Sequence, residues 1–120
     1  MILVDTSIWV DHLRSRDNRL GGLLDAASVV MHPFVLGELA CGNVRRHDEV
    51  LGLLNMLPSC PVATEPEALE FIGRRALMGR GLGYIDVHLL ASVALVPGMR
   101  LWTRDRRLAE EASRLRLAVD

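Results

Sequence analysis

Four carboxylates occupy positions where an acid is either costly or set against the end of a strand. Asp5 follows directly on three apolar residues, and Asp105 comes just after a candidate strand at 100–103. Glu38 and Asp86 lie in predicted helices, with apolar residues one turn away. A carboxylate removed from water must be hydrogen-bonded, ion-paired, protonated or bound to a metal. We therefore treat these four acids as candidates for chemistry.

Carboxylates that converge from distant parts of a chain repel one another. At about 5 Å and an effective dielectric of 20, two of them repel by roughly 3 kcal/mol, which is large beside a typical domain stability of roughly 5–15 kcal/mol. A divalent cation relieves this repulsion, and all-oxygen ligation with room for water suits Mg²⁺ or Mn²⁺ rather than zinc. Asp5 is well placed for such a site, because ligands of open α/β sheets bind beyond the carboxyl ends of the strands.

Each acid also has a purely structural explanation. Asp5 could cap the helix that follows it. Glu38 could pair with an arginine, and Asp86, near the start of its helix, could interact with the helix dipole. Asp105 lies in a first helical turn among arginines, where an acid is ordinary. The four together indicate a site more strongly than any one of them.

The elements that must position these acids alternate between strands and helices. Apolar runs predict strands at 1–4, 28–31 and 100–103, with a short extended piece at 61–63. Periodicity and capping residues, including Thr6 or Ser7 at the first helix, predict helices at 6–13, 17–26, 33–40, 44–57, 65–78, 84–96 and 104–115. The alternation favours right-handed crossovers between parallel strands. We expect an α/β fold: a three-layer α/β/α sandwich with a small parallel sheet of about four strands.

Composition is that of an ordinary soluble globular protein, with half the residues apolar, a quarter charged and a net charge of −1. The 120 residues predict one domain that buries roughly two-thirds of its unfolded surface. All 14 cationic side chains are arginine. Arginine suits bidentate phosphate contacts, although a GC-rich coding bias explains the same count.

The cysteines and the N-terminus bear on the compartment. Cys41 and Cys60 are not spaced as metal ligands and are too few for a disulfide framework, so we expect both to be reduced and buried. The N-terminus has no basic segment and carries a charge at position 5, unlike a secretory signal. No apolar run reaches the ~20 residues of a membrane span. These features predict a cytoplasmic protein without a membrane segment.

Four short motifs occur along the chain in a fixed order. They are Leu-Val-Asp-Thr-Ser-Ile-Trp at 3–9, Glu38 in the helix after the second strand, Gly-Leu-Gly-Tyr-Ile-Asp at 81–86 and Leu-Trp-Thr-Arg-Asp at 101–105. In these motifs the chain resembles PIN-domain proteins over essentially its whole length, and more narrowly the VapC toxins of bacterial toxin–antitoxin pairs. The resemblance implies one PIN-like ribonuclease domain over 1–120, which would cleave tRNA or rRNA and so inhibit translation.

The resemblance also implies roles for particular residues. Asp5 and Asp86 correspond to the main Mg²⁺ ligands, Glu38 completes the acidic pocket, and Asp105 holds a second metal or the attacking water. All four are thereby candidate catalytic residues and metal ligands, and Mn²⁺ is a possible substitute for Mg²⁺. Thr103 matches the small hydroxyl residue of the last motif and would orient Asp105 or a water. Hydrolysis by a water that the cation acidifies requires no protein nucleophile.

Arginines near the ends of elements are candidates for RNA contact. Arg80, in its glycine-rich loop, and Arg104 are the supporting residues of the predicted site, with further candidates at positions 14, 16 and 107. The favoured substrate is single-stranded or looped RNA, whose splayed bases allow recognition. His47 and His88 could imitate a metal-independent ribonuclease pair, but we interpret both as structural.

Partners follow from the resemblance as well. It implies a VapB-like antitoxin that blocks the acidic pocket and forms a heteromer with the toxin, together with a toxin homodimer. Trp9, Leu13 and the apolar faces of helices 44–57 and 65–78 could form such surfaces, or could be ordinary core.

Two other classes of protein remain as alternatives. A phosphoacceptor signalling domain would need adjacent acids after its first strand and a late lysine, and this chain has neither. A non-catalytic module that binds through a carboxylate pocket differs from the enzyme only in turnover.

Overall fold

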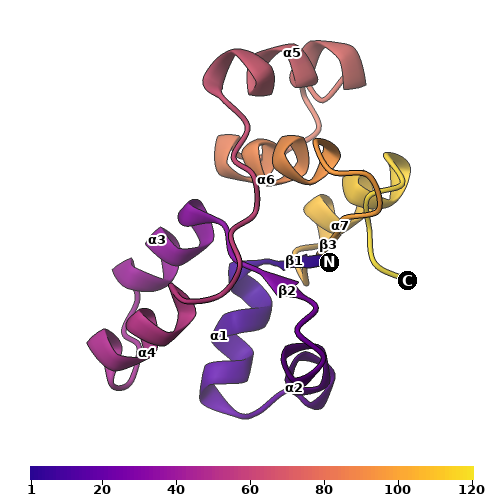
Figure 1. Ribbon diagram of the computed structural model, residues 1–120. Coiled ribbons are helices and arrows are strands. Elements are labelled where there is room, and N and C mark those ends of the chain that lie inside the picture. Colours follow the sequence, from indigo (N-terminus) through magenta and orange to yellow (C-terminus); the bar gives the residue numbers. More distant parts are fainter.

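The computed structural model describes all 120 residues and places a small parallel sheet between helices (Figure 1). Strand β1 (Ile2–Val4) lies in the centre, between β2 (Val29–Val30) and β3 (Arg100–Trp102). Ile2 is paired with Val29 on one side and with Arg100 on the other. Both faces of β1 are covered, as its apolar sequence without alternation predicts.

Seven helices account for most of the rest of the chain. They are α1 (Thr6–Arg14), α2 (Asn18–Asp25), α3 (Pro33–Cys41), α4 (His47–Leu54), α5 (Glu65–Arg75), α6 (Tyr84–Ala94) and α7 (Arg106–Arg114). Helices α1 and α2 lie on one side of the sheet, and α6 and α7 on the other (Figure 1). The predicted order of strands and helices and the α/β sandwich are confirmed, with boundaries that differ by a few residues.

The sheet has three strands rather than the expected four. The segment at 61–63 does not join it, and the chain instead touches the edge once, where Ser59 forms an isolated bridge with Met31. Two hydrogen bonds make this bridge, Met31 N–H to Pro58 O and Cys60 N–H to Met31 O, both of 2.8 Å. Pro58 lacks the N–H that would extend this ladder to Val29, and Pro33, the first residue of α3, lacks the N–H that would extend it in the other direction, so the pairing ends there.

Helix α6 is the centre of the packing, with every residue from Val87 to Val93 buried. Trp9 is also fully buried, so it belongs to the core and does not form a partner surface.

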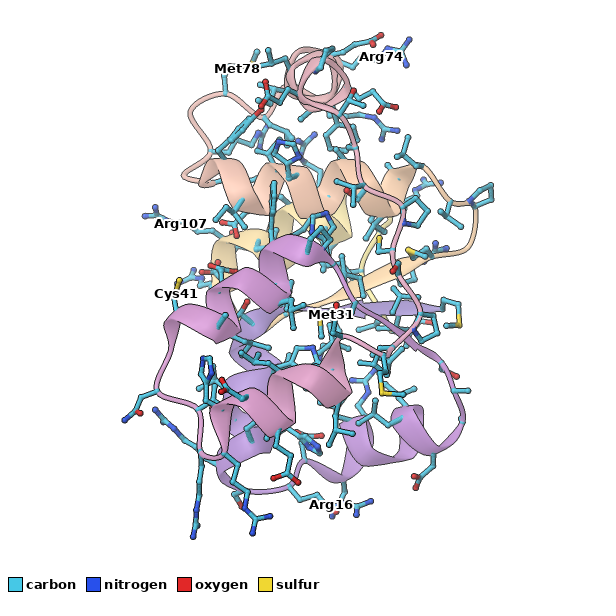
Figure 2. All side chains as sticks on the ribbon, turned by 60° about the vertical axis from the view of Figure 1, so that its left-hand side comes forward. Arg16, Met31, Cys41, Arg74, Met78 and Arg107 are labelled. Carbon is cyan, nitrogen blue, oxygen red and sulfur yellow. The ribbon has the colours of Figure 1, made fainter.

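Cys60 is buried as expected, but Cys41 is exposed, and Figure 2 shows its sulfur at the edge of the molecule. Cys41 shares an outward face of α3 with Glu38, one turn earlier, which explains the wrong prediction. None of the helices is long and apolar enough to cross a membrane.

A buried polar network joins α3 and α6 to the segment before α5. His32, which is fully buried, accepts a hydrogen bond at Nδ1 from Phe34 N–H (3.0 Å) and so caps α3. Its proton therefore lies on Nε2, which donates to Ser92 Oγ (3.1 Å). The same oxygen accepts from Ala63 N–H (3.0 Å). Burial, with a smaller effect of His88, lowers the pKa of His32 to about 4.

We predict that the stability supplied by neutral His32 is lost in acid. The pKa of His32 is 6.5 unfolded and about 4 folded, so the unfolded chain takes up the proton first, and the free energy of unfolding falls as pH drops through this window. The full effect is roughly 2–4 kcal/mol. His32→Asn keeps a capping oxygen but does not titrate. Its melting temperature, followed by circular dichroism from neutral pH to about pH 4, should fall less than that of the wild type; equal falls would contradict the prediction.

Candidate functional site

The four predicted acids gather at the carboxyl end of the sheet. Asp5 ends β1, Asp105 follows β3, Glu38 lies in α3 and Asp86 in the first turn of α6. The pKa of Asp86 is raised by its burial and then by the charges of Asp5, Asp105 and Glu38, against the lowering effect of a hydrogen bond from Gly83 N–H. Because Coulomb repulsion falls with distance, the contributions of the other three charges agree with the placement of all four acids at this end of the sheet.

The four acids differ in how far they are buried. Asp5 is 7% exposed and Asp86 is half-buried, whereas Glu38 and Asp105 are exposed. The prediction that all four avoid the surface is therefore wrong for the last two. The apolar neighbour Phe34, one turn before Glu38, is itself at the surface, so it does not bury the carboxylate. The site therefore has one buried acid, Asp5, and is bordered by acids that are half-buried or exposed.

Two hydroxyls hold the carboxylate of Asp5. Its Oδ2 accepts hydrogen bonds from Thr103 Oγ1 (2.7 Å) and Ser7 Oγ (3.2 Å), and the side chain does not cap α1. The two hydroxyls in turn accept from the backbone N–H groups of Asp105 and Arg104, both at 3.0 Å. These bonds fasten the turn after β3 to the turn after β1. Asp5 Oδ1 accepts no hydrogen bond from the protein, which leaves it available to a ligand.

A third hydroxyl orients Glu38. Thr6 Oγ1 donates to Glu38 Oε1 at 2.7 Å and so links α1 to α3. Glu38 has no arginine partner, contrary to its simplest structural explanation. Sequence analysis treated Thr6 and Ser7 only as possible helix caps and so missed their role in the site. The signal was present, because two consecutive hydroxyls follow a carboxylate at the end of a strand.

Each of the remaining two acids uses one carboxylate oxygen to accept a hydrogen bond from a backbone N–H. Asp105 Oδ1 accepts from Leu108 N–H (3.0 Å) and caps α7, which is the structural role considered for it. Asp86 Oδ2 accepts from Gly83 N–H (3.3 Å) at the start of α6. Each retains a second oxygen without a hydrogen bond, so capping and ligand binding are compatible at both positions.

The two arginines predicted to support the site are paired elsewhere. Arg104 binds Asp11 and, at 2.6 Å, Asp17, so its guanidinium points towards α1 and α2. The Leu20 N–H and then Arg104 lower the pKa of Asp17. Arg80 Nη1 lies 3.3 Å from Glu111 Oε1. Either arginine would have to leave these partners to reach RNA.

Glu111 is a buried acid that sequence analysis did not single out. It is 7% exposed and is clamped by Arg80 and by Arg114, whose Nε lies 2.7 Å from Oε2. Glu111 is spaced three residues from Leu108 and four from Leu115, which places it on the inward face of α7. This spacing is the feature of the sequence from which its burial could have been predicted. The clamp fastens α7 to the loop before α6.

The histidines take structural positions, as we interpreted them. His88 is buried between the rings of Phe34 (5.0 Å) and Tyr84 (4.6 Å), in edge-to-face contact with both. His47 donates from Nε2 to Ala40 O (2.8 Å) and lies beside Asp48, which raises its pKa. Neither ring hydrogen-bonds to a site acid.

The donor set suits a hydrated Mg²⁺ or Mn²⁺. Its donors are carboxylate oxygens. Burial and then the charges of neighbouring acids raise the pKa of Asp86, and a dication neutralises those charges. The structure has no group of three or more His, Cys, Asp or Glu side chains that could hold a metal ion between them. Mg²⁺ is usually bound by one or two carboxylates and keeps several waters. The free oxygens of Asp5 and Asp86 fit that mode.

Comparison with known proteins gives two findings. A family model described as PIN domain matches residues 2–113, a range that includes all four acids. Over 108 residues the chain is 56% identical to Ribonuclease VapC32 of Mycobacterium tuberculosis, in strains CDC 1551 / Oshkosh and ATCC 25618 / H37Rv alike. The aligned part covers 90% of this chain and 87% of each relative.

We predict that Asp86→Asn raises the melting temperature of the protein in EDTA at neutral pH. The pKa of Asp86 is higher in the folded state than its ordinary 3.8, so the folded state holds this proton more tightly, and stability declines as pH rises through the raised pKa. Asparagine removes the charge and keeps an oxygen for Gly83 N–H.

Glu65→Gln is the matched control, because it removes one charge from the exposed first turn of α5. Differential scanning calorimetry of both variants should show a gain specific to Asp86→Asn, and the gain should vanish below about pH 4, where the carboxyl is protonated in both states. A gain no larger than that of the control would contradict the raised pKa of Asp86.

Proposed function

Because this chain belongs to the PIN-domain family, we propose that it is a metal-dependent endoribonuclease acting as the toxin of a type II toxin–antitoxin system. The observation that carries the proposal is the placement of four carboxylates from separate elements at the carboxyl end of the sheet. The charges of the other three add to the effect of burial in raising the pKa of Asp86. The 56% identity to Ribonuclease VapC32 supports the nuclease activity.

Asp5 and Asp86 would hold the divalent cation, Mg²⁺ or Mn²⁺, with Glu38 and Asp105 at its rim. The bound cation supplies two things: it makes water acidic enough to act as a nucleophile near neutral pH, and it neutralises charge on the phosphate. The protein's own contribution is to hold the carboxylate of Asp5 in a fixed orientation. Hydrogen bonds from the hydroxyls of Thr103 and Ser7 to Oδ2 of Asp5 fix its orientation before any ligand arrives. Preorganised groups do not have to reorient during reaction.

No protein nucleophile is needed, and the nearest hydroxyls are committed to other bonds. Ser7 Oγ donates to Asp5 and accepts from Arg104 N–H, so its proton and one of its two lone pairs are in use. Thr103 Oγ1 is held in the same way between Asp5 and Asp105. These contacts favour hydrolysis by water over a covalent intermediate on the enzyme.

The proposed substrate is a single-stranded stretch of tRNA or rRNA in the cytoplasm, whose cleavage would inhibit translation. A VapB-like antitoxin would restrain the enzyme, and the toxin would pair as a homodimer. Exposed apolar side chains support partner surfaces on α4 and α5: Leu53 on α4 is 62% exposed, Met56 in the turn after α4 is 81% exposed, and Leu69 on α5 is 62% exposed.

The two alternatives make different predictions. A phosphoacceptor domain would expose Asp5 for transfer beside a lysine, but this acid is 7% exposed and the chain has no lysine. A binding module would take up the cation and RNA without cleaving the RNA. Turnover therefore separates it from the nuclease.

We predict that Mg²⁺ or Mn²⁺ raises the melting temperature of the wild type and supports RNA cleavage, and that Asp5→Asn removes both effects. A ligand that binds only the folded state stabilises it by mass action, and loss of a metal ligand should lower cleavage by on the order of 100-fold or more. Thermal melts and gels of end-labelled RNA, with Mg²⁺ and with EDTA, measure the two effects.

Asp25→Asn is the control, because it makes the same change at an exposed position at the end of α2. It should melt and cleave as the wild type does. If Asp5→Asn cleaves RNA at the rate of this control, the nuclease assignment fails; if the wild type binds metal and RNA without any cleavage, the binding module is correct.

A further inference from the structure

Most of the arginines are engaged within the protein, and a few are free. Nine make hydrogen bonds, ion pairs or contacts with aromatic rings. Arginines without any such contact lie at positions 14, 16, 45, 107 and 116. A free guanidinium is available for an anion outside the protein, and three of these five flank the acids.

Two of the free arginines share a groove with a site acid. The groove, of about 460 Å³, lies between α1 and the connection from α3 to α4, and Glu38 is part of its lining. Arg14 at the end of α1 and Arg45 in the connection also line it. Between them lie apolar side chains such as Leu13 and Val44. A polyanion that reached Glu38 through this groove would meet both cations.

Arg107 lies on the α6–α7 side of the same acids, against the backbone of Gly81. A Cβ added at Gly81 would lie 2.6 Å from Arg107 Nη1 and 2.9 Å from its Cδ, so only glycine leaves room for this side chain. The loop containing Gly81 leads directly into α6, and Arg107 follows Asp105 by two residues. Figure 2 shows Arg107 on the same side of the molecule as Cys41, which follows Glu38 on α3.

We propose that Arg14, Arg45 and Arg107 form a track for the backbone phosphates of single-stranded RNA across the acidic site, and that Gly81 positions Arg107. The proposal rests on the proposed nuclease function and extends it to substrate binding. The net charge of −1 provides no general attraction for RNA. Acids that repel phosphate therefore need cations on both flanks, and Arg80 and Arg104 are already paired.

The salt dependence of RNA binding tests the track. The probe is a short, fluorescein-labelled single-stranded RNA of mixed sequence, titrated in EDTA by fluorescence anisotropy, so that affinity is measured apart from cleavage. Replacing each of Arg14, Arg45 and Arg107 by glutamine should reduce the slope of log K against log salt by about 0.7, and so lower affinity roughly fivefold at about 0.1 M salt. Arg116→Gln is the control and should change neither.

Substitutions in the glycine-rich loop test whether Gly81 positions Arg107. Gly81→Ala should displace the guanidinium and weaken RNA binding about as much as Arg107→Gln, with no further loss when the two changes are combined. Gly79→Ala is the matched control, because Gly79 has a similar φ of +73°, against +80° at Gly81, but nothing within 4 Å of an added Cβ. Both alanines carry similar backbone strain, so a difference in RNA affinity reports on Arg107.

The outcomes separate this proposal from the nuclease assignment. Affinity and salt slope unchanged in the three arginine variants, or changed equally by Arg116→Gln, would overturn the track even if the wild type cleaves RNA. Weakening by Arg107→Gln alone would also overturn it and would leave the groove to a protein partner. Loss of affinity in all three variants, with no cleavage by the wild type, would support the track and reject the nuclease.

Discussion

The constraint on which the structure depends is the gathering of four carboxylates at one end of a three-stranded sheet. Their mutual repulsion opposes folding, and it adds to the effect of burial in raising the pKa of Asp86. Hydrogen bonds offset part of this cost: hydroxyls hold Asp5 and Glu38, and backbone N–H groups hold Asp86 and Asp105. Each acid nevertheless keeps an oxygen free. The fold thus concentrates negative charge and leaves a dication to balance it.

Charge elsewhere in the molecule is arranged around that centre. Arg104 is next to Asp105 in sequence, yet its guanidinium binds Asp11 and Asp17, so it does not neutralise the site. Glu111 is also buried, but Arg80 and another arginine clamp it within the fold. One set of ion pairs stabilises the packing of helices, and a separate set of free arginines borders the acids. This separation leaves free cations for the proposed RNA track in a protein whose net charge is only −1.

Sequence reasoning succeeded where local pattern and topology agree. An apolar run without alternation predicted the buried strand that ends at Asp5, and the parallel order of strands then brought Asp105 to the same edge. It failed where the outcome depended on neighbours. The fourth strand did not form because proline prevents the backbone pairing that it needs. Cys41 and Glu38 proved to be exposed, and the ion-pair partner of Arg80, Glu111, lies on α7.

By itself, the sequence determined the α/β order, the buried first strand, the four acids and their family resemblance, because these depend on residue type, periodicity and spacing along the chain. Only the tertiary structure decided how each acid is held and which arginines are free. Hydroxyls at 6, 7 and 103 and guanidinium groups at 80 and 104 can each reach several partners, and packing selects among them. The choice rests on side-chain directions across separate helices, which no local pattern encodes.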